Sequence, residues 1–371
     1  MHTLAAVCRT TGGQFTLETL KIDEPRVNEI LIKVVGTGIC HTDLGMRDSP
    51  DRVPKPIVLG HEGAGIVVKT GKHVTKVKPG DHVVMTFNSC GHCASCYQSD
   101  ATYCAELVRR NFSGQREDGT TALSDGQAPV HSHFFAQSAF STYAICSERN
   151  AVAVRQDIPI ERLGPLGCGI QTGAGAVINS LQVPPGSSIG IFGTGSVGLA
   201  AVIASKISGA GTIIAVDTNS NRLEVARALG ATHTINPLED DLFTSIKNTL
   251  PGGLNFALDT SGNLDIIHDA IAHLSPRGVC GLINTAKGAD LRANIFQMVV
   301  GGRSIKGIHQ GDSIPEIFIP QMIDMYVQGK FPFDKLITYY ELADINNAIA
   351  DMERGKTIKP VILMPQSVTT A

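Results

Sequence analysis

The stretch Ser188–Gly198, SIGIFGTGSVG, decides the fold of this chain. Residues 188–192 form an apolar run typical of a buried strand, and residues 198–208 are rich in Ala, Ile and Val, which favours a helix. The turn between them reads G-x-G-x-x-G. The next apolar run, 212–216, ends at Asp217, nineteen residues after Gly198. A strand, a glycine-rich turn, a helix and an acidic strand end together predict a dinucleotide-binding βαβ unit.

The glycine-rich turn is expected to hold the pyrophosphate of the dinucleotide. Gly193, Gly195 and Gly198 allow a tight turn and a close approach of the phosphates to the helix N-terminus, where Ser196 and Val197 lie. The backbone N–H groups and the dipole of a helix N-terminus favour anions. The sequence therefore predicts that these five residues contact the cofactor.

The acidic residue at the second strand end predicts which dinucleotide is bound. Asp217 is placed to accept hydrogen bonds from a ribose diol and would repel a 2'-phosphate, so we expect NAD rather than NADP. Arg222, five residues further on, has two interpretations. It either reaches the adenosine ribose or lies on a solvated helix face.

The same pattern extends on both sides of this unit and divides the chain. Strand and helix signals alternate from about residue 187 to 312, which predicts a doubly wound parallel sheet of the Rossmann type. The first third has strand-like alternation with many turns and predicts a β-rich lobe, with a long surface loop within residues 105–140. We expect a catalytic domain over 1–170, a coenzyme domain over 171–312, and a return to the catalytic domain over 313–371.

Composition excludes several classes of function. The chain has 371 residues, 43% of them hydrophobic, and a net charge of −3 with basic and acidic residues interspersed. The sequence has no basic stripe for nucleic acid, no polybasic helix for a membrane surface and no apolar run long enough to cross a bilayer. Nine cysteines without a targeting segment indicate a reducing compartment. We therefore expect a cytoplasmic protein.

Four of the cysteines form the most specific motif of the chain. Cys90, Cys93, Cys96 and Cys104 read C-x2-C-x2-C-x7-C. Four thiolates within fifteen residues suit one tetrahedral Zn²⁺, which takes Cys sulfur at about 2.3 Å. Disulfides are the alternative, but a dense tetrad without a secretory context favours a metal. Because four ligands fill the coordination shell, this zinc is predicted to be structural.

Three further motifs predict a second zinc with an open coordination position. They are the stretches around Cys40, His61 and Cys168, which supply two thiolates and one imidazole. Each residue alone is more often an ordinary core or surface residue. Three protein ligands leave the fourth position for water or substrate, which is the arrangement of catalytic zinc.

With these motifs in place, the chain resembles the zinc-dependent medium-chain alcohol dehydrogenase family over nearly its whole length. Residues 60–74 match the zinc signature of that family, G-H-E-x2-G-x5-G-x2-V, at every position. The resemblance implies a β-rich, GroES-like catalytic domain in front of the Rossmann domain. It also implies that Cys40, His61 and Cys168 hold the catalytic zinc and that two Zn²⁺ bind per subunit.

The resemblance assigns roles to the neighbouring residues as well. It implies that Thr42 accepts the alcohol proton, that Asp43 hydrogen-bonds His61 and fixes its tautomer, and that Glu62 lies behind the metal. Three more residues are expected to contact the cofactor: Thr172, His41 and Lys359. For His41 and Lys359, the alternative is a solvated charge.

The implied reaction is reversible oxidation of a primary alcohol by hydride transfer from a zinc-bound alkoxide to NAD. The chain departs from the best-known animal relatives at Gly45, where their proton relay ends in a histidine. The relay then ends in water or another group, and the sequence does not name the base.

The adjacent Phe134 and Phe135 fall in the segment that resembles the family's alcohol pocket. Aromatic pockets favour flat rings, so we expect an aromatic alcohol such as benzyl alcohol, with two core phenylalanines as the alternative. One competing function is a glutathione-dependent formaldehyde dehydrogenase, which would need Arg109 or Arg110 in place of Val108. Another is a non-catalytic NAD-binding protein. The resemblance further implies a homodimer or homotetramer that pairs its sheets near residues 304–307.

Overall fold

The computed structural model describes residues 1–284 and 290–365, which divide into two compact units. Unit 1 comprises Met1–Cys168, Ile314–Met322 and the chain from Asp334 onward, and unit 2 comprises Gly169–Ser313 and Ile323–Phe333. The boundaries at 168/169 and 313/314 lie close to those expected from the sequence. The sequence did not predict that Ile323–Phe333 belongs to unit 2, because an apolar helix shows no preference between two cores.

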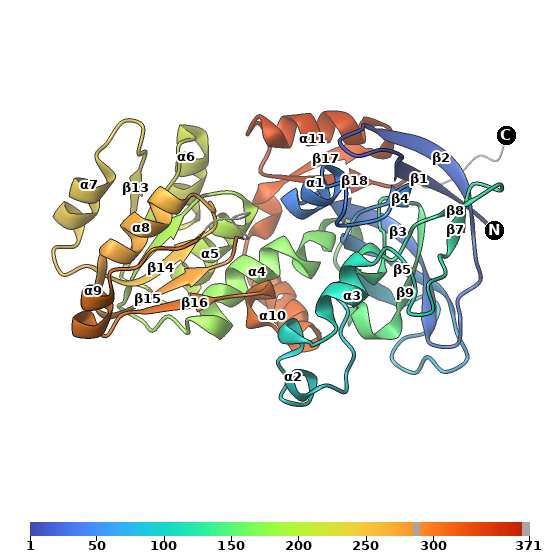
Figure 1. Cartoon of the computed structure of the whole chain (residues 1–371), viewed down its shortest axis with the longest axis horizontal. Helices are drawn as coiled ribbons and strands as arrows, with labels where there is room; N and C mark the ends of the chain where they lie inside the picture. Colours follow the sequence, from blue (N-terminus) through green and yellow to red (C-terminus); the bar gives the residue numbers. More distant parts are fainter. Residues whose placement is uncertain (285–289, 366–371) are drawn as a thin grey trace. The chain divides into compact units, whose positions relative to one another are not determined.

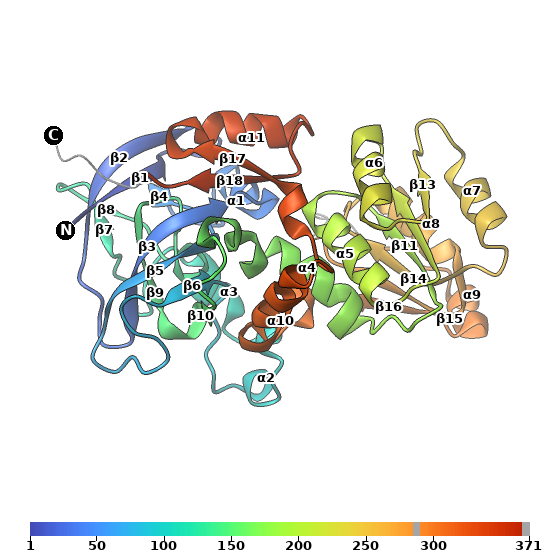
Figure 2. The same ribbon diagram turned by 180° about the vertical axis from the view of Figure 1, so that it is seen from behind.

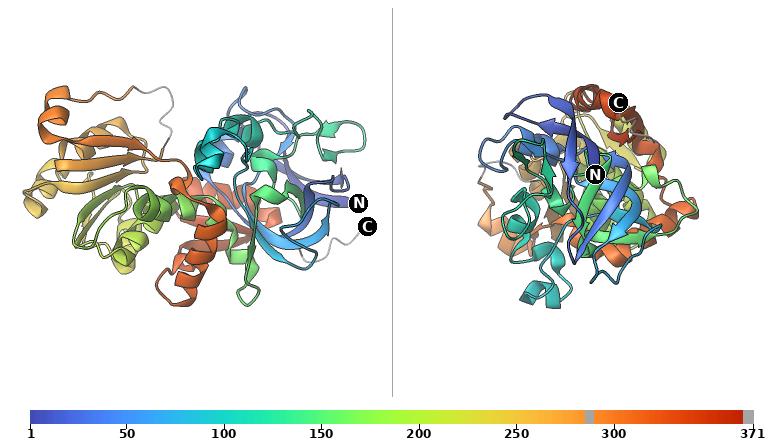
Figure 3. Two further views of the ribbon diagram at one scale, coloured as in Figure 1. Left: turned by 90° about the horizontal axis from the view of Figure 1, so that it is seen from below. Right: turned by 90° about the vertical axis from the view of Figure 1, so that its right-hand side faces the viewer.

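Unit 1 contains two sheets. The smaller one has the strand order β4-β1-β2-β7-β8 and consists of β1 (His2–Cys8), β2 (Phe15–Ile22), β4 (Ile57–Val58), β7 (Leu123–Ser124) and β8 (Pro129–Val130). Strands β1 and β2 lie side by side as an antiparallel pair (Figure 3).

The larger sheet of unit 1 carries the order β10-β6-β5-β3-β18-β17, with β9 also paired to β3. Its strands are β3 (Glu29–Gly38), β5 (Glu62–Thr70), β6 (His82–Met85), β9 (Tyr143–Ser147), β10 (Ala151–Val154), β17 (Ile337–Glu341) and β18 (Lys359–Leu363). The last two strands come from the C-terminal part of the chain, and β18 pairs with β3. The expected return of the C-terminal segment therefore places β18 beside the strand that leads to Cys40.

Short helices connect and cover these sheets. They are α1 (His41–Arg47), α2 (Ala94–Tyr97), α3 (Leu107–Phe112) and α11 (Ile345–Glu353). Helix α11 packs against β17 and β18 (Figures 1 and 2). One continuous apolar core lies between these elements and includes Phe134, Phe135 and Phe140.

Unit 2 contains a six-stranded sheet in which every pairing is parallel, with the order β13-β12-β11-β14-β15-β16. Its strands are β11 (Ser188–Phe192), β12 (Thr212–Val216), β13 (His233–Ile235), β14 (Leu254–Asp259), β15 (Leu274–Leu282) and β16 (Ser304–Gly307). The order reverses direction at β11, which is the mark of a doubly wound sheet. The predicted fold class is confirmed.

Helices cover both faces of this sheet. Within unit 2 they are α4 (Gly169–Gly175), α5 (Ser196–Ile207), α6 (Ser220–Leu229), α7 (Leu242–Thr249), α8 (Leu264–Ala272) and α9 (Ile295–Gly301), while α10 (Pro315–Val327) is divided between the units. Helices α5 and α6 lie on one face and α8 on the other (Figures 1 and 2). Right-handed crossovers on either side of β11 require this arrangement. Within 1–284 and 290–365, no helix is both long enough and apolar enough to span a bilayer.

The sequence predicted a surface loop within residues 105–140, and residues 117–120 and 125–129 of this range are exposed. The end of the range differs, because all residues from Ser132 to Phe140 are buried. Polar side chains of this buried segment make hydrogen bonds inside the core.

Candidate functional site

Two thiols, one imidazole and one carboxylate converge in unit 1. The possible ligand atoms of Cys40, His61, Glu62 and Cys168 all lie within 4.8 Å of one another. Cys40 precedes α1 directly after β3, His61 precedes β5, and Cys168 follows a short 3-10 turn at Gly164–Gly167. Residues more than a hundred positions apart in the sequence therefore meet at the end of one sheet.

Local backbone geometry presents His61 to this cluster. Gly60 has φ +91°, and a Cβ there would lie 2.5 Å from the backbone N of Phe140, so only glycine fits. The Gly60 N–H donates to Oδ1 of Asp43 at 3.0 Å, and the same oxygen lies 2.9 Å from Nδ1 of His61. Asp43 thus anchors both the turn and the ring, which is the role that the resemblance implied.

The contact with Asp43 determines which ring nitrogen faces the cluster. With Nδ1 as the donor to the carboxylate, the lone pair of the imidazole lies on Nε2. The Nε2 atom is buried and has no hydrogen-bond partner among residues 1–284 and 290–365. A buried nitrogen left without a partner is costly, and a metal ion satisfies it. The donor set of this site therefore fits zinc.

The thiols of the cluster also suit a metal. The pKa of Cys40 lies well below its ordinary value, chiefly because of a hydrogen bond from Cys168. The thiolate is the form of cysteine that binds metals. Cys40, Cys168 and His61 would hold Zn²⁺ through two sulfurs and one nitrogen, leaving one position open.

Glu62 has its own partner and is not a free fourth ligand. Both of its carboxylate oxygens lie 2.9 Å from Nζ of Lys359, which also donates to the carbonyl of Ile39 at 3.0 Å. The side chains of Glu62 and Lys359 are 0% and 2% exposed. Three acceptors match the three protons of the ammonium group. The resemblance assigned Lys359 to a cofactor phosphate, whereas here its donors are directed to the residues behind the zinc ligands.

The pKa values of both members of this pair are raised, for different reasons. Burial raises the pKa of Glu62 to about 7, against the lowering effect of the Lys359 charge. Burial lowers the pKa of Lys359, but the charge of Glu62 raises it overall. The bidentate contact is that of a charged pair, so we treat both groups as ionised.

Thr42 and His41 lie in the first turn of α1. The hydroxyl oxygen of Thr42 lies 3.7 Å from Sγ of Cys40, so it is beside a zinc ligand as expected. His41 is exposed. Around Gly45, in the same helix, a Cβ would meet no atom within 4 Å. The position where relatives carry a histidine is therefore open space.

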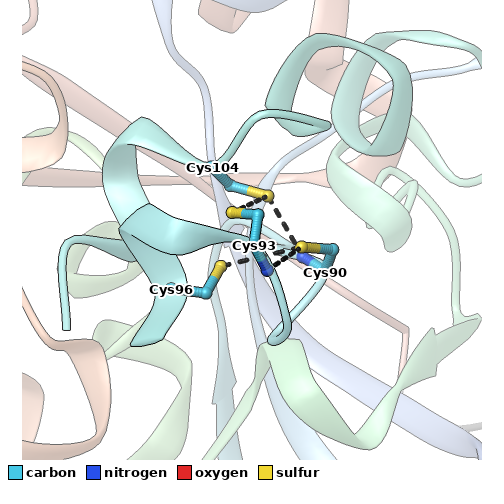
Figure 4. A group of neighbouring side chains, drawn as sticks. All are labelled: Cys90, Cys93, Cys96 and Cys104. Atoms are coloured by element: carbon cyan, nitrogen blue, oxygen red, sulfur yellow. Dashed lines mark hydrogen bonds between the residues drawn. The ribbon is translucent and has the colours of Figure 1, made fainter. Parts of the chain in front are cut away.

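The four cysteines of the second motif also converge, as Figure 4 shows. Sγ of Cys90 lies 3.9 Å from Sγ of Cys96, and Sγ of Cys93 lies 4.0 Å from Sγ of Cys104. Sulfurs placed about 2.3 Å from a tetrahedral zinc would be separated by about 3.8 Å. All four residues are free thiols, which excludes the disulfide alternative for this structure.

Backbone N–H groups point at these sulfurs. Cys104 Sγ accepts from the N–H of Cys90 at 3.2 Å, and Cys90 Sγ accepts from the N–H of Cys93 at 3.3 Å. Such donors stabilise thiolate charge. The cluster fits a closed structural zinc with four sulfur ligands.

The glycine-rich turn of unit 2 has the geometry of a phosphate site. Gly195 is the N-cap of α5, whose first turn contains Ser196 and Val197, and a Cβ at Gly195 would meet nothing within 4 Å. A Cβ at Gly198 would lie 1.9 Å from the carbonyl oxygen of Gly193, so glycine is needed there for the turn to close. Backbone N–H groups and open space above Gly195 suit an approaching anion.

Asp217 directly follows β12, and Arg222 lies in α6. Oδ2 of Asp217 accepts from the N–H and the hydroxyl of Thr194, at 2.6 and 2.8 Å. The carboxylate is thus fixed next to the glycine-rich turn. Nε of Arg222 is buried without a hydrogen-bond partner in the described part of the chain. Thr172 lies in α4, where its hydroxyl lies 3.5 Å from Oε1 of Gln310.

Phe134 and Phe135 contact the zinc ligand His61. The ring of Phe135 stacks on the imidazole at 4.4 Å between centroids, and Phe134 meets it edge-on at 5.4 Å. Phe112 packs on both. Phe134 is 0% exposed and Phe135 is 4% exposed. Both phenylalanines are therefore core residues in this structure, and the ring of Phe135 is the one stacked on the imidazole.

Comparison with known proteins identifies the family. Residues 26–156 match the model of the alcohol dehydrogenase GroES-like domain, and residues 196–328 match that of zinc-binding dehydrogenase. Geraniol dehydrogenase of Castellaniella defragrans is 45% identical over 362 residues, which is 97% of each chain. The chain belongs to the zinc-dependent medium-chain alcohol dehydrogenases. The resemblance stated from the motifs is confirmed.

Two solved structures of this family are similar along the whole chain. An alcohol dehydrogenase zinc-binding domain protein from Burkholderia ambifaria is 47% identical with a TM-score of 0.97, covering 99% of this chain and 100% of that one. Benzyl alcohol dehydrogenase from Acinetobacter calcoaceticus is 45% identical with a TM-score of 0.95, covering 98% of this chain and 100% of that one. The fold of a primary-alcohol dehydrogenase is thus shared from end to end.

Sequence reasoning missed two parts of the site. It did not pair Lys359 with Glu62, because the two residues are 297 positions apart and no spacing rule connects them. It also passed over Gln137, whose side-chain amide contacts the backbone of His61. A buried glutamine in a polar segment has no sequence signature, so no signal would have found it.

Proposed function

We propose that this alcohol dehydrogenase oxidises aromatic primary alcohols such as benzyl alcohol to the aldehyde, with NAD as the oxidant. The observation that carries the proposal is the open donor set of Cys40, His61 and Cys168 in one unit, together with the glycine-rich turn and Asp217 in the other. The alcohol loses one proton and one hydride, and NAD⁺ becomes NADH. The reverse reaction reduces the aldehyde.

Each partner of the site has a defined task in this proposal. When bound, the catalytic zinc would polarise the alcohol oxygen, and NAD would take up the hydride. Asp43 holds the His61 ring in one tautomer, and the hydroxyl of Thr42, next to Cys40, accepts the alcohol proton. With Gly45 in the next turn of α1, water takes the proton from Thr42 onward. The second zinc, on the four cysteines of residues 90–104, would only stabilise the fold.

The finer choice of substrate is supported by two relatives and one side chain. The relatives at 45% identity are named for benzyl alcohol and for geraniol, both alcohols with a large unsaturated group. Phe135 stacks on the ring of His61, with 4.4 Å between the centroids, and so brings an aromatic ring next to a candidate zinc ligand. An aromatic or allylic substituent would pack against such a ring.

Oxidation of S-(hydroxymethyl)glutathione is disfavoured, because the two arginines that could bind the glutathione carboxylate already have carboxylate partners. Arg109 contacts Glu106 at 2.6 Å, and Arg110 contacts both Glu106 and Glu117. Val108, at the position where that subfamily has its arginine, is 71% exposed. Arginines already paired with carboxylates are poor receptors for a further carboxylate.

Asp217 favours NAD over NADP in this proposal, because a carboxylate next to the glycine-rich turn would accept ribose hydroxyls and repel a 2'-phosphate. We also propose that two copies pair through β16, the edge strand of the parallel sheet, and the adjacent α9. Four apolar side chains of α9 are at least 70% exposed: Ile295, Phe296, Val299 and Val300. Exposed apolar groups of this size next to an unpaired strand edge are typical of an interface. Six cysteines in two thiol clusters favour a reducing compartment, the cytoplasm.

The experiment that tests the function is NAD reduction by the purified zinc-loaded protein with benzyl alcohol, geraniol, ethanol and S-(hydroxymethyl)glutathione. We expect the highest kcat/KM with benzyl alcohol. Cys168→Ser should nearly abolish turnover with each alcohol, lose one zinc per subunit and still bind NAD. Full turnover in Cys168→Ser with both zincs retained would show that the open site is assigned wrongly.

A pair of phenylalanine variants tests the aromatic preference. Phe135→Ala removes a ring contact worth about 0.5–1.5 kcal/mol, so kcat/KM for benzyl alcohol should fall roughly threefold to tenfold. Any effect of Phe135→Ala through His61 should lower kcat/KM for ethanol and benzyl alcohol alike, so the ratio of benzyl alcohol to ethanol isolates the ring contact. Phe134→Ala serves as the control, because Phe134 is fully buried and should lower stability without changing the ratio of the two substrates. An unchanged ratio in Phe135→Ala would contradict the aromatic assignment.

A further inference from the structure

The segment His133–Ser138 has an unusual backbone for residues with side chains. His133, Phe135, Ala136 and Ser138 all have φ between +51° and +64°, the left-handed region that favours glycine. Non-glycine residues stay in this region only where the surrounding structure holds them there, and such strain concentrates at functional sites. The described chain therefore holds a strained and fully buried segment next to a zinc ligand.

Hydrogen bonds hold the segment in this conformation. The hydroxyl of Ser138 accepts from the N–H of Phe134 at 3.0 Å and donates to the carbonyl of Val58 at 2.6 Å. The N–H of Ala139 donates to the carbonyl of Gly60 at 2.8 Å. Hydrogen bonds thus join this segment and Ala139 to Val58 and Gly60, which lie just before His61.

Gln137 is the residue of this segment whose side chain hydrogen-bonds the backbone of His61 and Gly63. Its Oε1 accepts from the N–H of Gly63 at 3.1 Å, and its Nε2 donates to the carbonyl of His61 at 3.0 Å and to that of Thr86 at 3.3 Å. The side chain is 1% exposed. Both protons of the amide and its oxygen are used, so one side chain fixes the backbone on both sides of Glu62.

The same segment also fixes the His61 ring from two directions. Phe135 stacks on one face of the imidazole and Phe134 meets it edge-on, while Asp43 holds Nδ1. The backbone contact of Gln137 and the two ring contacts come from four consecutive residues, 134–137. Both the backbone and the ring of one metal ligand are therefore held by one strained segment.

We propose that Gln137 is a positioning residue for the catalytic zinc, which acts by holding the backbone of His61 so that Nε2 keeps its direction. The inference rests on the proposed zinc-dependent function and deepens it, because no motif of the family signature points to this residue. Groups that orient a metal ligand typically change metal affinity about 10–100-fold when they are removed. Gln137 should behave as such a group although it touches no donor atom.

The test compares Gln137→Leu with Thr3→Val in the zinc-loaded protein. Thr3 is also fully buried in unit 1, and its hydroxyl accepts from the N–H of Tyr143 at 2.9 Å, but it makes no contact with His61. Both variants lose buried hydrogen bonds and should melt at lower temperature. We expect Gln137→Leu alone to release one of the two zincs to a chelator about 10–100-fold faster, with the other zinc unaffected.

A spectroscopic measurement gives a second readout that stability alone does not move. Co²⁺ placed in the catalytic site should show altered visible absorption bands in Gln137→Leu and unchanged bands in Thr3→Val. If Gln137→Leu does not fold, Gln137→Glu replaces it, because a carboxylate still accepts from Gly63 but cannot donate to His61 or Thr86. Unchanged zinc release and unchanged bands in the variant that folds would overturn the inference.

The failure of this inference is distinguishable from that of the proposed function. If the wild-type protein holds no zinc at Cys40, His61 and Cys168, the proposed function fails first. If the wild type holds that zinc and oxidises alcohols but the Gln137 variants release it normally, only the role of Gln137 is refuted.

Discussion

Replacing Lys359 by methionine isolates the energetic effect of the buried charge behind the zinc ligands. Methionine retains much of the apolar stem of lysine but has no positive charge. The substitution leaves the carboxylate of Glu62, which is 0% exposed, without the ammonium that lies 2.9 Å from both of its oxygens. Removing one partner of a buried ion pair costs about 3–5 kcal/mol, because the remaining charge stays desolvated.

Lys356→Met provides a control with the same substitution at the same distance. Nζ of Lys356 lies 2.9 Å from Oδ2 of Asp351, but the lysine side chain is 71% exposed. Exposed pairs contribute about 0.2–1 kcal/mol. The two lysines differ in burial, and Asp351 also keeps its contacts with Tyr340 and Arg354 when Lys356 is replaced. The structure therefore predicts at least a threefold difference between the effects of the two variants on stability.

Scanning calorimetry of the zinc-loaded proteins measures this difference. At about 2–4 °C per kcal/mol, Lys359→Met should lower the melting temperature of unit 1 by roughly 6–20 °C. A second substitution, Glu62→Gln in the Lys359→Met background, removes the stranded charge and should recover much of the loss. Equal shifts for the Lys359 and Lys356 variants, or no recovery in the double variant, would refute the argument that burial makes this pair important.

Three further predictions follow from other parts of the chain. Cys96→Ser removes one of four sulfur ligands, so soluble yield or melting temperature should fall and metal analysis should show loss of one zinc; a variant as stable as the wild type with both zincs would contradict the tetrad. Asp217→Gly removes charged acceptors worth about 1.5–3 kcal/mol, so kcat/KM for NAD should fall roughly 10–100-fold and the ratio of NADP to NAD use should rise. Gly45→Ala should stabilise α1 by about 0.5–1 kcal/mol, because a Cβ there meets nothing within 4 Å. Gly38→Ala should destabilise the protein, because its Cβ would lie 2.0 Å from Oε2 of Glu62. Urea unfolding of both variants checks the sign of each change in the free energy of unfolding.

The sequence by itself determined the family and predicted the candidate metal-binding residues that the structure brings together. Its motifs are local. The four cysteines lie within fifteen residues, and the glycine-rich turn has a strand directly before it and a helix directly after it. Spacing alone predicts such features, because a short segment has few ways to place four thiols or a tight turn. The strands predicted at 188–192 and 212–216 coincide with β11 and β12 for the same reason.

The tertiary structure alone decided what surrounds those ligands. Lys359 meets Glu62 because β18 pairs with β3, and this pairing brings residue 359 beside the end of the strand before Cys40. Gln137 reaches His61 because several residues of 133–138 adopt a left-handed backbone, which no motif in the sequence predicts. Both contacts depend on long-range strand pairing and on buried hydrogen bonds. A one-dimensional pattern does not encode these, since partners far apart in sequence meet only after the chain has folded.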